Sequence, residues 1–347
     1  MKKILIAGVL ILLMTTSVSA LEIQAPEAPE RVSDLVSETA DSFGQGLWNV
    51  IKAAIAQIDG PLKEAMSSCL GAACAVLLCG VLREASLRVS GNAINLACCC
   101  AISCILLNPS DTLIRMGLET AQELREYGNL LLPVMTGAMA ARGGVTTSAA
   151  IYSATALVNS LLSSFLTRLM KPMIYLFLAL CIANCVLKDD MLGKMGAFIR
   201  WAMTWVLKMT LYLFTGYISI TGAVSGSADA AAVRAAKLAI SGTVPVVGGI
   251  LSDASELVLV SAGTLGSAAG VYGMITVLAL FSGPFVRIGI QYLLLRGVSA
   301  FCGAFDHDGA SGLLADFASA MGMVLAMVST QTMLLLISTM CFMKGVG

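Results

Sequence analysis

Charge is scarce in this sequence. Only 12% of its 347 residues are Asp, Glu, Lys or Arg, and 58% are hydrophobic, whereas soluble domains carry about 25% charged residues. So few polar side chains cannot solvate soluble domains of this total length. The 21 basic and 21 acidic residues cancel, which argues against a nucleic-acid-binding surface. With a mean hydropathy of +0.88, the composition predicts an all-α, polytopic membrane protein.

Signatures of catalysis are also lacking. The sequence has no GxxxxGK(S/T) phosphate loop, no HExxH zinc motif and no GxSxG nucleophile elbow. Its one histidine, His307, lies between two aspartates in FDHDGASG, a composition typical of a turn. We therefore expect no enzymatic activity, no cofactor and no metal site.

Cysteine, by contrast, is plentiful, with eleven residues. They lie in or beside apolar runs, without the CxxC pairs of a zinc site or the polar loops of a disulfide scaffold. We interpret them as small, soft residues that face lipid or neighbouring helices. The alternative is a thiol cluster between Cys98 and Cys104.

The N-terminus has the three parts of an export signal. Residues 1–20 read MKKILIAGVLILLMTTSVSA, with two lysines, an apolar core and a small-residue cleavage site, which predicts a signal peptide. Residues 21–64 would then be exported. Two amphipathic helices are predicted there from apolar residues at helical spacing, namely Val32, Leu35, Val36, Thr39 and Phe43, then Leu47, Ile51, Ala54, Ile55 and Ile58.

The remainder, 65–347, is predicted to be a multi-span membrane domain with six to eight crossings. Arg83 and Arg88 follow the first apolar run and favour a cytoplasmic loop there. A charge-free, Ser/Thr-rich run at 143–167 is interpreted as lining a polar interior. The other candidate spans are 65–82, 89–110, 172–187, 209–228, 257–286, 284–305 and 317–343.

Two segments have the same order of features and suggest an internal duplication. Each has a helix followed by a Pro-Val-x-x-Gly sequence, PVMTG from Pro133 and PVVGG from Pro245, and then a run of small residues. The predicted repeats cover 62–170 and 171–283, followed by a terminal hairpin at 284–347. Broken or re-entrant helices at matching positions are typical of secondary transporters, and inside a membrane they persist only within protein or beside water.

Charged residues near these breaks have two interpretations. Asp253 and Glu256 have the spacing of a capping box that opens a helix. Alternatively they form a polar path with Arg234 and Lys237. The candidate residues for the breaks and the path are Pro133, Gly137, Arg142, Arg234, Lys237, Pro245, Gly248, Gly249, Asp253 and Glu256.

A polar stripe is predicted on the helix that precedes the first break. It would lie opposite an apolar face of Ile114, Leu118, Ala121 and Leu124. This is typical of a solvated surface helix, and docking of a partner is the alternative. The stripe consists of Asp111, Arg115, Glu119, Gln122 and Glu126.

Two runs resemble stage III sporulation protein AE of endospore-forming bacteria: SGSADAAAVRAAKLAISGTVPVVGGILSDASELVL at 225–259 and NLLLPVMTGAMAARGG at 129–144. The resemblance implies a sporulation protein in the mother-cell membrane around the forespore. It also implies membership of a trans-envelope channel or secretion-type complex, as a permease-like subunit. The implied partners are other proteins of the same operon, including one that resembles a secretion ATPase, and forespore stage II sporulation protein Q.

Three functional hypotheses follow. The first is a permease-like subunit of that complex. The second is a self-sufficient secondary transporter for a small solute, and the third is a purely structural membrane scaffold. A homo-oligomer is compatible with each of them.

Overall fold

The computed structural model describes residues 26–29, 32–33, 43–85, 91–141, 146–187, 189–221, 268–304 and 310–344. Every long element within these ranges is a helix, which confirms the predicted all-α class. The helices are α2 (Phe43–Ala56), α3 (Asp59–Ala85), α4 (Gly91–Ala141), α5 (Thr146–Leu187), α6 (Asp190–Thr221), α9 (Ala268–Gly303) and α10 (Ala310–Lys344). The predicted signal peptide lies outside the described residues.

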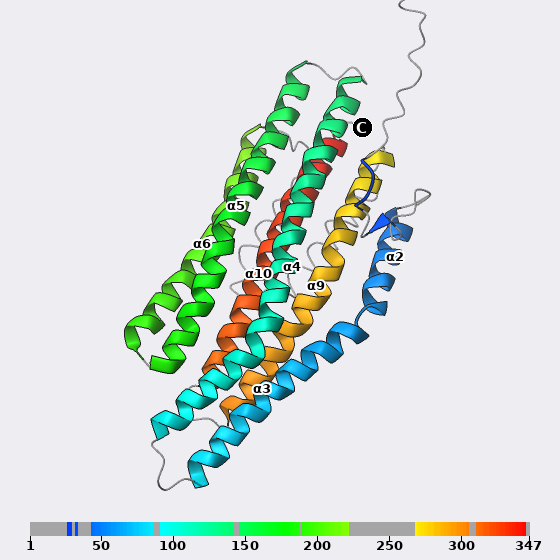
Figure 1. The fold of residues 1–347 in the computed structure, drawn as a ribbon. Helices are drawn as coiled ribbons and strands as arrows, with labels where there is room; N and C mark the ends of the chain where they lie inside the picture. Colours follow the sequence, from blue (N-terminus) through cyan, green and yellow to red (C-terminus); the bar gives the residue numbers. More distant parts are fainter. Residues whose placement is uncertain are drawn as a thin grey trace, which may run out of the picture.

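The long helices run alternately up and down one elongated bundle (Figure 1). Helix α10 lies at its centre and packs against α9, α4, α5 and α6. It can do so because its apolar residues cover its whole circumference, and Leu314, Phe317, Val324 and Leu334 have no exposed surface. Helices α5 and α6 form one side of the bundle, while α3 and α2 lie on the other, against α9 (Figure 1).

Proline does not end these helices. Pro109 and Pro133 lie inside α4, Pro172 inside α5 and Pro284 inside α9. The break predicted at Pro133 and Gly137 is therefore wrong, because α4 continues through both residues to Ala141. Proline removes one backbone hydrogen bond, a loss that helices tolerate when their neighbours hold the rest of the helix in place.

Five described helices are long and apolar enough to cross a membrane, namely α3, α4, α5, α9 and α10. Several predicted spans merge, since the described parts of 143–167 and 172–187 lie in α5, and 284–303 is the second part of α9. The predicted number of six to eight crossings counted some of these parts separately. Part of it also rested on residues 222–267, outside the described ranges.

The predicted boundaries within the membrane domain fall inside helices. The junction between the two repeats, at 170–171, lies in the middle of α5. The terminal hairpin exists as α9 and α10, but it begins at Ala268 rather than at Pro284. Much of the second predicted repeat lies outside the described residues.

Helix α2 packs through a face that only partly matches the prediction. Of the predicted apolar positions, Phe43 is buried and Leu47 packs partly buried against the core, whereas Ile51 and Ile55 are exposed. Gly46 and Val50 complete the buried face. A side chain at Gly46 would collide with Ile275 of α9. The absence of that side chain lets the two helices approach closely, and this approach selects the buried face.

One pair of cysteines departs from our interpretation. Cys99 of α4 and Cys185 of α5 form a disulfide, with their Cα atoms 6.1 Å apart. Each lies within an apolar helix rather than in a polar loop, so the flanking sequence gave no sign of a crosslink. The disulfide joins the start of α4 to the end of α5 at one end of the bundle.

Candidate functional site

A row of polar side chains runs along α5 inside the bundle. Thr155, Asn159, Ser163 and Thr167 recur at every fourth residue and therefore share one face of the helix. The first three are buried, with no more than 5% of their surface exposed. This polar row agrees with the prediction that the Ser/Thr-rich run lines a polar interior.

Gln331 of the central helix α10 completes the polar row. Its Nε2 donates to the backbone oxygen of Ser163 at 3.0 Å and to Thr167 Oγ1 at 2.9 Å, and its Oε1 accepts from Ser163 Oγ. Asn159 Oδ1, one turn away, is buried without a hydrogen-bond partner. A buried amide oxygen without a partner is costly in an apolar interior, which singles out this position within the polar row.

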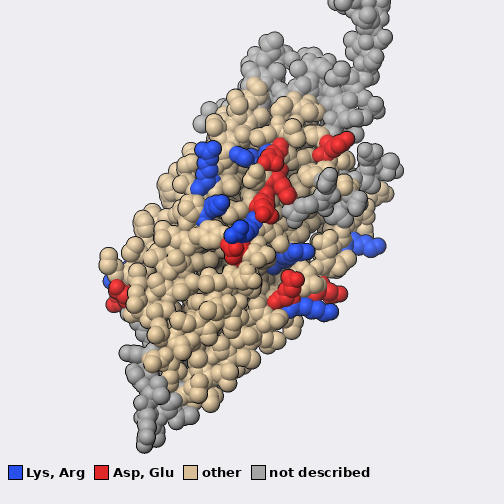
Figure 2. All heavy atoms as spheres, in the orientation of Figure 1, with Lys and Arg blue, Asp and Glu red and all other residues tan. Residues whose placement is uncertain are grey.

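A second polar feature lies on the outside of the bundle, at the middle of α4. Ile114, Ala121 and Leu124 are buried, while Arg115 and Glu119 are exposed, as the predicted polar stripe requires. Asp111 accepts from Arg115 Nε at 2.7 Å and from the Tyr175 hydroxyl of α5 at 2.8 Å. Figure 2 shows acidic and basic side chains gathered across the middle of one face, with uncharged surface above and below.

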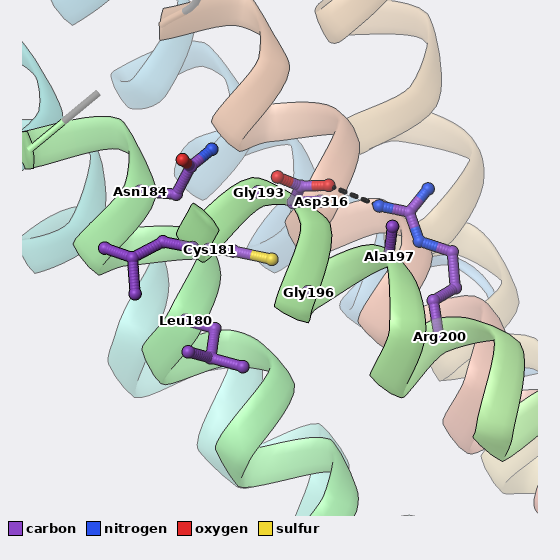
Figure 3. Close-up of a pocket in the computed structure, with 9 residues that line it drawn as sticks. Leu180, Cys181, Asn184, Gly193, Gly196, Ala197, Arg200 and Asp316 are labelled. Carbon is purple, nitrogen blue, oxygen red and sulfur yellow. Dashed lines mark hydrogen bonds and ion pairs between the residues drawn. The ribbon is translucent and has the colours of Figure 1, made fainter. Parts of the chain in front are cut away.

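A cavity of about 160 Å³ lies between α5, α6 and α10 (Figure 3). Arg200 of α6 donates to Asp316 of α10 at 2.8 Å, and its guanidinium lies 5.3 Å from the centre of the Phe177 ring. Cys181 and Asn184 of α5 contribute a thiol and an amide to the lining. Gly193 of α6 leaves room for the Asn184 amide. The ion pair joins α6 to α10, and the contact of Arg200 with the Phe177 ring adds α5.

The structure describes few of the predicted site residues. Pro133 is an exposed residue within α4, and the backbone of Gly137 continues the same helix. Neither lies at a helix break. The others lie outside the described residues, namely Arg142, Arg234, Lys237, Pro245, Gly248, Gly249, Asp253 and Glu256. Their interpretation as a polar path or as helix caps stays a prediction.

Sequence reasoning missed Gln331, Arg200 and Asp316. Gln331 is the only amide side chain in the apolar run 317–343, and such a residue in a predicted span marks an interior contact. Arg200 lies between the predicted spans 172–187 and 209–228, where a loop is expected. No feature of the sequence alone pairs it with a carboxylate 116 residues later.

These features define a class of protein: a helical membrane protein whose long apolar helices enclose a row of polar side chains. Among the described residues, no cluster of His, Cys, Asp or Glu could hold a metal ion. Comparison with protein families gives a match to stage III sporulation protein AE over residues 35–345. The chain belongs to this family of sporulation proteins, as its resemblance indicated.

One curated relative is the stage III sporulation protein AE of Bacillus subtilis (strain 168). It is 21% identical over 184 residues, which cover 53% of this chain and 46% of the relative. The aligned part thus spans about half the length of the relative. No solved structure matches this chain.

Proposed function

We propose that this chain is a permease-like subunit of a channel or secretion-type complex that connects the mother cell to the forespore and supports forespore development. It would lie in the mother-cell membrane around the forespore, with its N-terminal region exported. Its partners would be other stage III proteins of the same operon, including a secretion-type ATPase, and forespore stage II sporulation protein Q. We propose no catalytic role.

The polar row is the observation that carries this proposal. Hydrogen bonds between α5 and α10 would stabilise a scaffold as well, but a buried acceptor without a partner gives a scaffold no advantage. A subunit that passes polar solutes or water needs hydrogen-bonding groups along its interior. The polar row supplies them over three turns of α5, and Asn159 Oδ1 offers an acceptor that no protein group occupies.

The test replaces Gln331 by Leu, which keeps the size of the side chain and removes its hydrogen bonds. In a sporulating cell with this chain as its only copy, we expect forespore gene expression and spore yield to fall. Hydrogen bonds between membrane helices contribute about 0.6 to 1.7 kcal/mol each, so the amount of protein in the membrane should stay close to normal.

Two matched variants make this test specific. Asn159→Leu should give the same loss of spores, because its apolar side chain interrupts the same polar row. Ser282→Ala, on α9, removes a hydroxyl that bonds only to its own helix and should have no effect. Normal sporulation with Gln331→Leu and Asn159→Leu would show that the polar row is structural and would favour the scaffold.

A further inference from the structure

The exposed face formed by α4 and α5 carries two parallel columns of charged side chains. The column on α4 is mainly acidic: Glu119 and Glu126 are exposed, and Arg115 at its end is paired with Asp111. On α5 it is basic, with Arg168 and Lys171 exposed. Figure 2 shows lysine and arginine side chains beside a column of acidic ones in the middle of this face, over α5 and α4 of Figure 1.

The two columns lie at the same height along the bundle. Arg125 Nη1 of α4 donates to Ser164 Oγ of α5 at 3.0 Å, and Tyr175 of α5 donates to Asp111 of α4 at 2.8 Å. These two contacts fix the antiparallel register. Arg168 is four residues from Ser164 and seven from Tyr175, so it lies level with residues 118–121 of α4. Glu119 is in that range.

Within the part of the chain that the structure describes, the columns do not neutralise each other. The ion pairs found there are Arg115–Asp111 and Arg200–Asp316, and neither includes Glu119, Arg168 or Lys171. Beyond the charges the same face is apolar, because Leu157 and Leu161 of α5 are 66% and 69% exposed. A charged centre with an apolar extension is suited to a protein partner rather than to lipid.

We propose that this face binds the same face of a second copy of the chain. A two-fold axis parallel to the helices, placed between α4 and α5, sets α4 of each copy against α5 of the other. Glu119 of each copy then faces Arg168 of its partner at the same height, and Leu157 lies level with the exposed Leu130 of the partner's α4. One copy therefore carries both halves of the complementary charge pattern, as a symmetric dimer requires.

The inference goes beyond the proposed function, because it names a partner and a surface that the polar row does not involve. Gln331→Leu should leave the dimer intact. The two proposals can therefore fail separately.

The test uses charge reversal in the full chain, purified in nanodiscs or mild detergent and weighed by native mass spectrometry. The wild-type chain should form dimers. Arg168→Glu should lower the dimer association constant at least about tenfold, since the new carboxylate would then meet Glu119 of the partner. Adding Glu119→Lys should restore the dimer, which also shows that the reversed chain folds. Lys194→Glu, an exposed reversal on α6, is the matched control.

Crosslinking between two tagged copies locates the interface. One copy carries Glu119→Cys and the other Arg168→Cys, in a background in which Ser replaces the exposed Cys74, Cys100 and Cys104. A disulfide that joins the two tags supports the proposal. A monomeric wild-type chain, or a dimer indifferent to the reversals, would overturn it. Reversals that disrupt only assembly with other proteins in cells would also overturn it, since the face would then bind a different protein.

Discussion

Gly117 sets how closely α4 approaches the central helix. A Cβ atom added there would lie 2.3 Å from Val324 Cγ1 of α10, and the β-branched Val324 has little freedom to move away. Gly128, three turns further on, meets Leu335 in the same way. Contacts of this kind replace the hydrophobic driving force that helices lack inside a membrane.

We therefore expect Gly117→Ala to destabilise the bundle by about 1 to 3 kcal/mol, the usual cost of overpacking. Gly289→Ala is the control, because nothing lies within 4 Å of its added Cβ; it should be neutral or slightly stabilising, since Ala favours helix more than Gly. Thermal unfolding in detergent measures both. Equal unfolding temperatures for the two variants would contradict the close contact of α4 with α10.

The Arg200–Asp316 ion pair gives a second prediction at this scale. Arg200→Met leaves the partly buried Asp316 carboxylate, 25% exposed, without its cation. We expect a loss of about 1.5 to 3 kcal/mol, the range for hydrogen bonds to charged groups. Thermal unfolding should also show that Arg200→Met with Asp316→Asn recovers part of it. Lys194→Met removes an exposed charge from the same helix, and an equal effect there would show that the ion pair contributes nothing.

At the scale of helices, the disulfide holds α4 and α5 at one end, and the contacts of Gln331 link α5 to α10 further along. Peptide mapping without reduction should recover Cys99 joined to Cys185. Cys99→Ser and Cys185→Ser should lower the unfolding temperature equally, and the double variant should lower it no further, because the two residues form one bond. Cys104→Ser, at an exposed free cysteine of α4, is the control.

Two separate cysteine-containing peptides, or additive effects of the two serine variants, would contradict this crosslink. The sequence could not predict it. Which of eleven thiols meet depends on the register of α4 against α5, and that register depends on pairs such as Tyr175 and Asp111 that are far apart in the chain.

The sequence pattern predicts which segments are helices, but it does not predict where each helix ends. The polar stripe opposite Ile114 and Leu124 needed only a period of 3.6 residues, and the structure confirms it. The helix ends depended on Pro133, Pro172 and Pro284, which we took as boundaries. A single missing hydrogen bond does not end a helix whose sides are held by neighbours, and the neighbours are not visible in a local sequence window.

The molecule as a whole is longer than a membrane is thick. The 51 residues of α4 extend about 76 Å at 1.5 Å per residue, against about 30 Å of hydrocarbon. Its apolar ends are separated by the charged middle. One part of the bundle must therefore lie outside the hydrocarbon, whichever part the bilayer covers.

Cysteine labelling tests this conclusion. Leu96 and Leu130 are exposed on α4 and 34 residues apart, or about 51 Å. At least one of Leu96→Cys and Leu130→Cys should react with an impermeant maleimide applied to both sides of the membrane. Both should react in detergent, which is the control. Protection of both in the membrane would require a tilt of more than about 50°, far beyond the usual range.

Family and fold class could be predicted from the sequence, because apolar composition and the run at 129–144 need no tertiary information. The polar interior was predicted as a segment, but its partner Gln331 was not, since that contact spans 168 residues. Most residues proposed for the second break lie outside the described part of the chain.

The central position of α10 has a consequence for how the protein is made. This helix leaves the ribosome after every other described helix, yet α9, α4, α5 and α6 all pack against it. The earlier helices must therefore wait in the bilayer with their inner faces uncovered, including the Ser163 and Thr167 hydroxyls that Gln331 later joins. Until α10 inserts, insertion factors can bind the incomplete bundle and membrane proteases can cleave it. Insertion of α10 ends the period in which the chain is open to quality control.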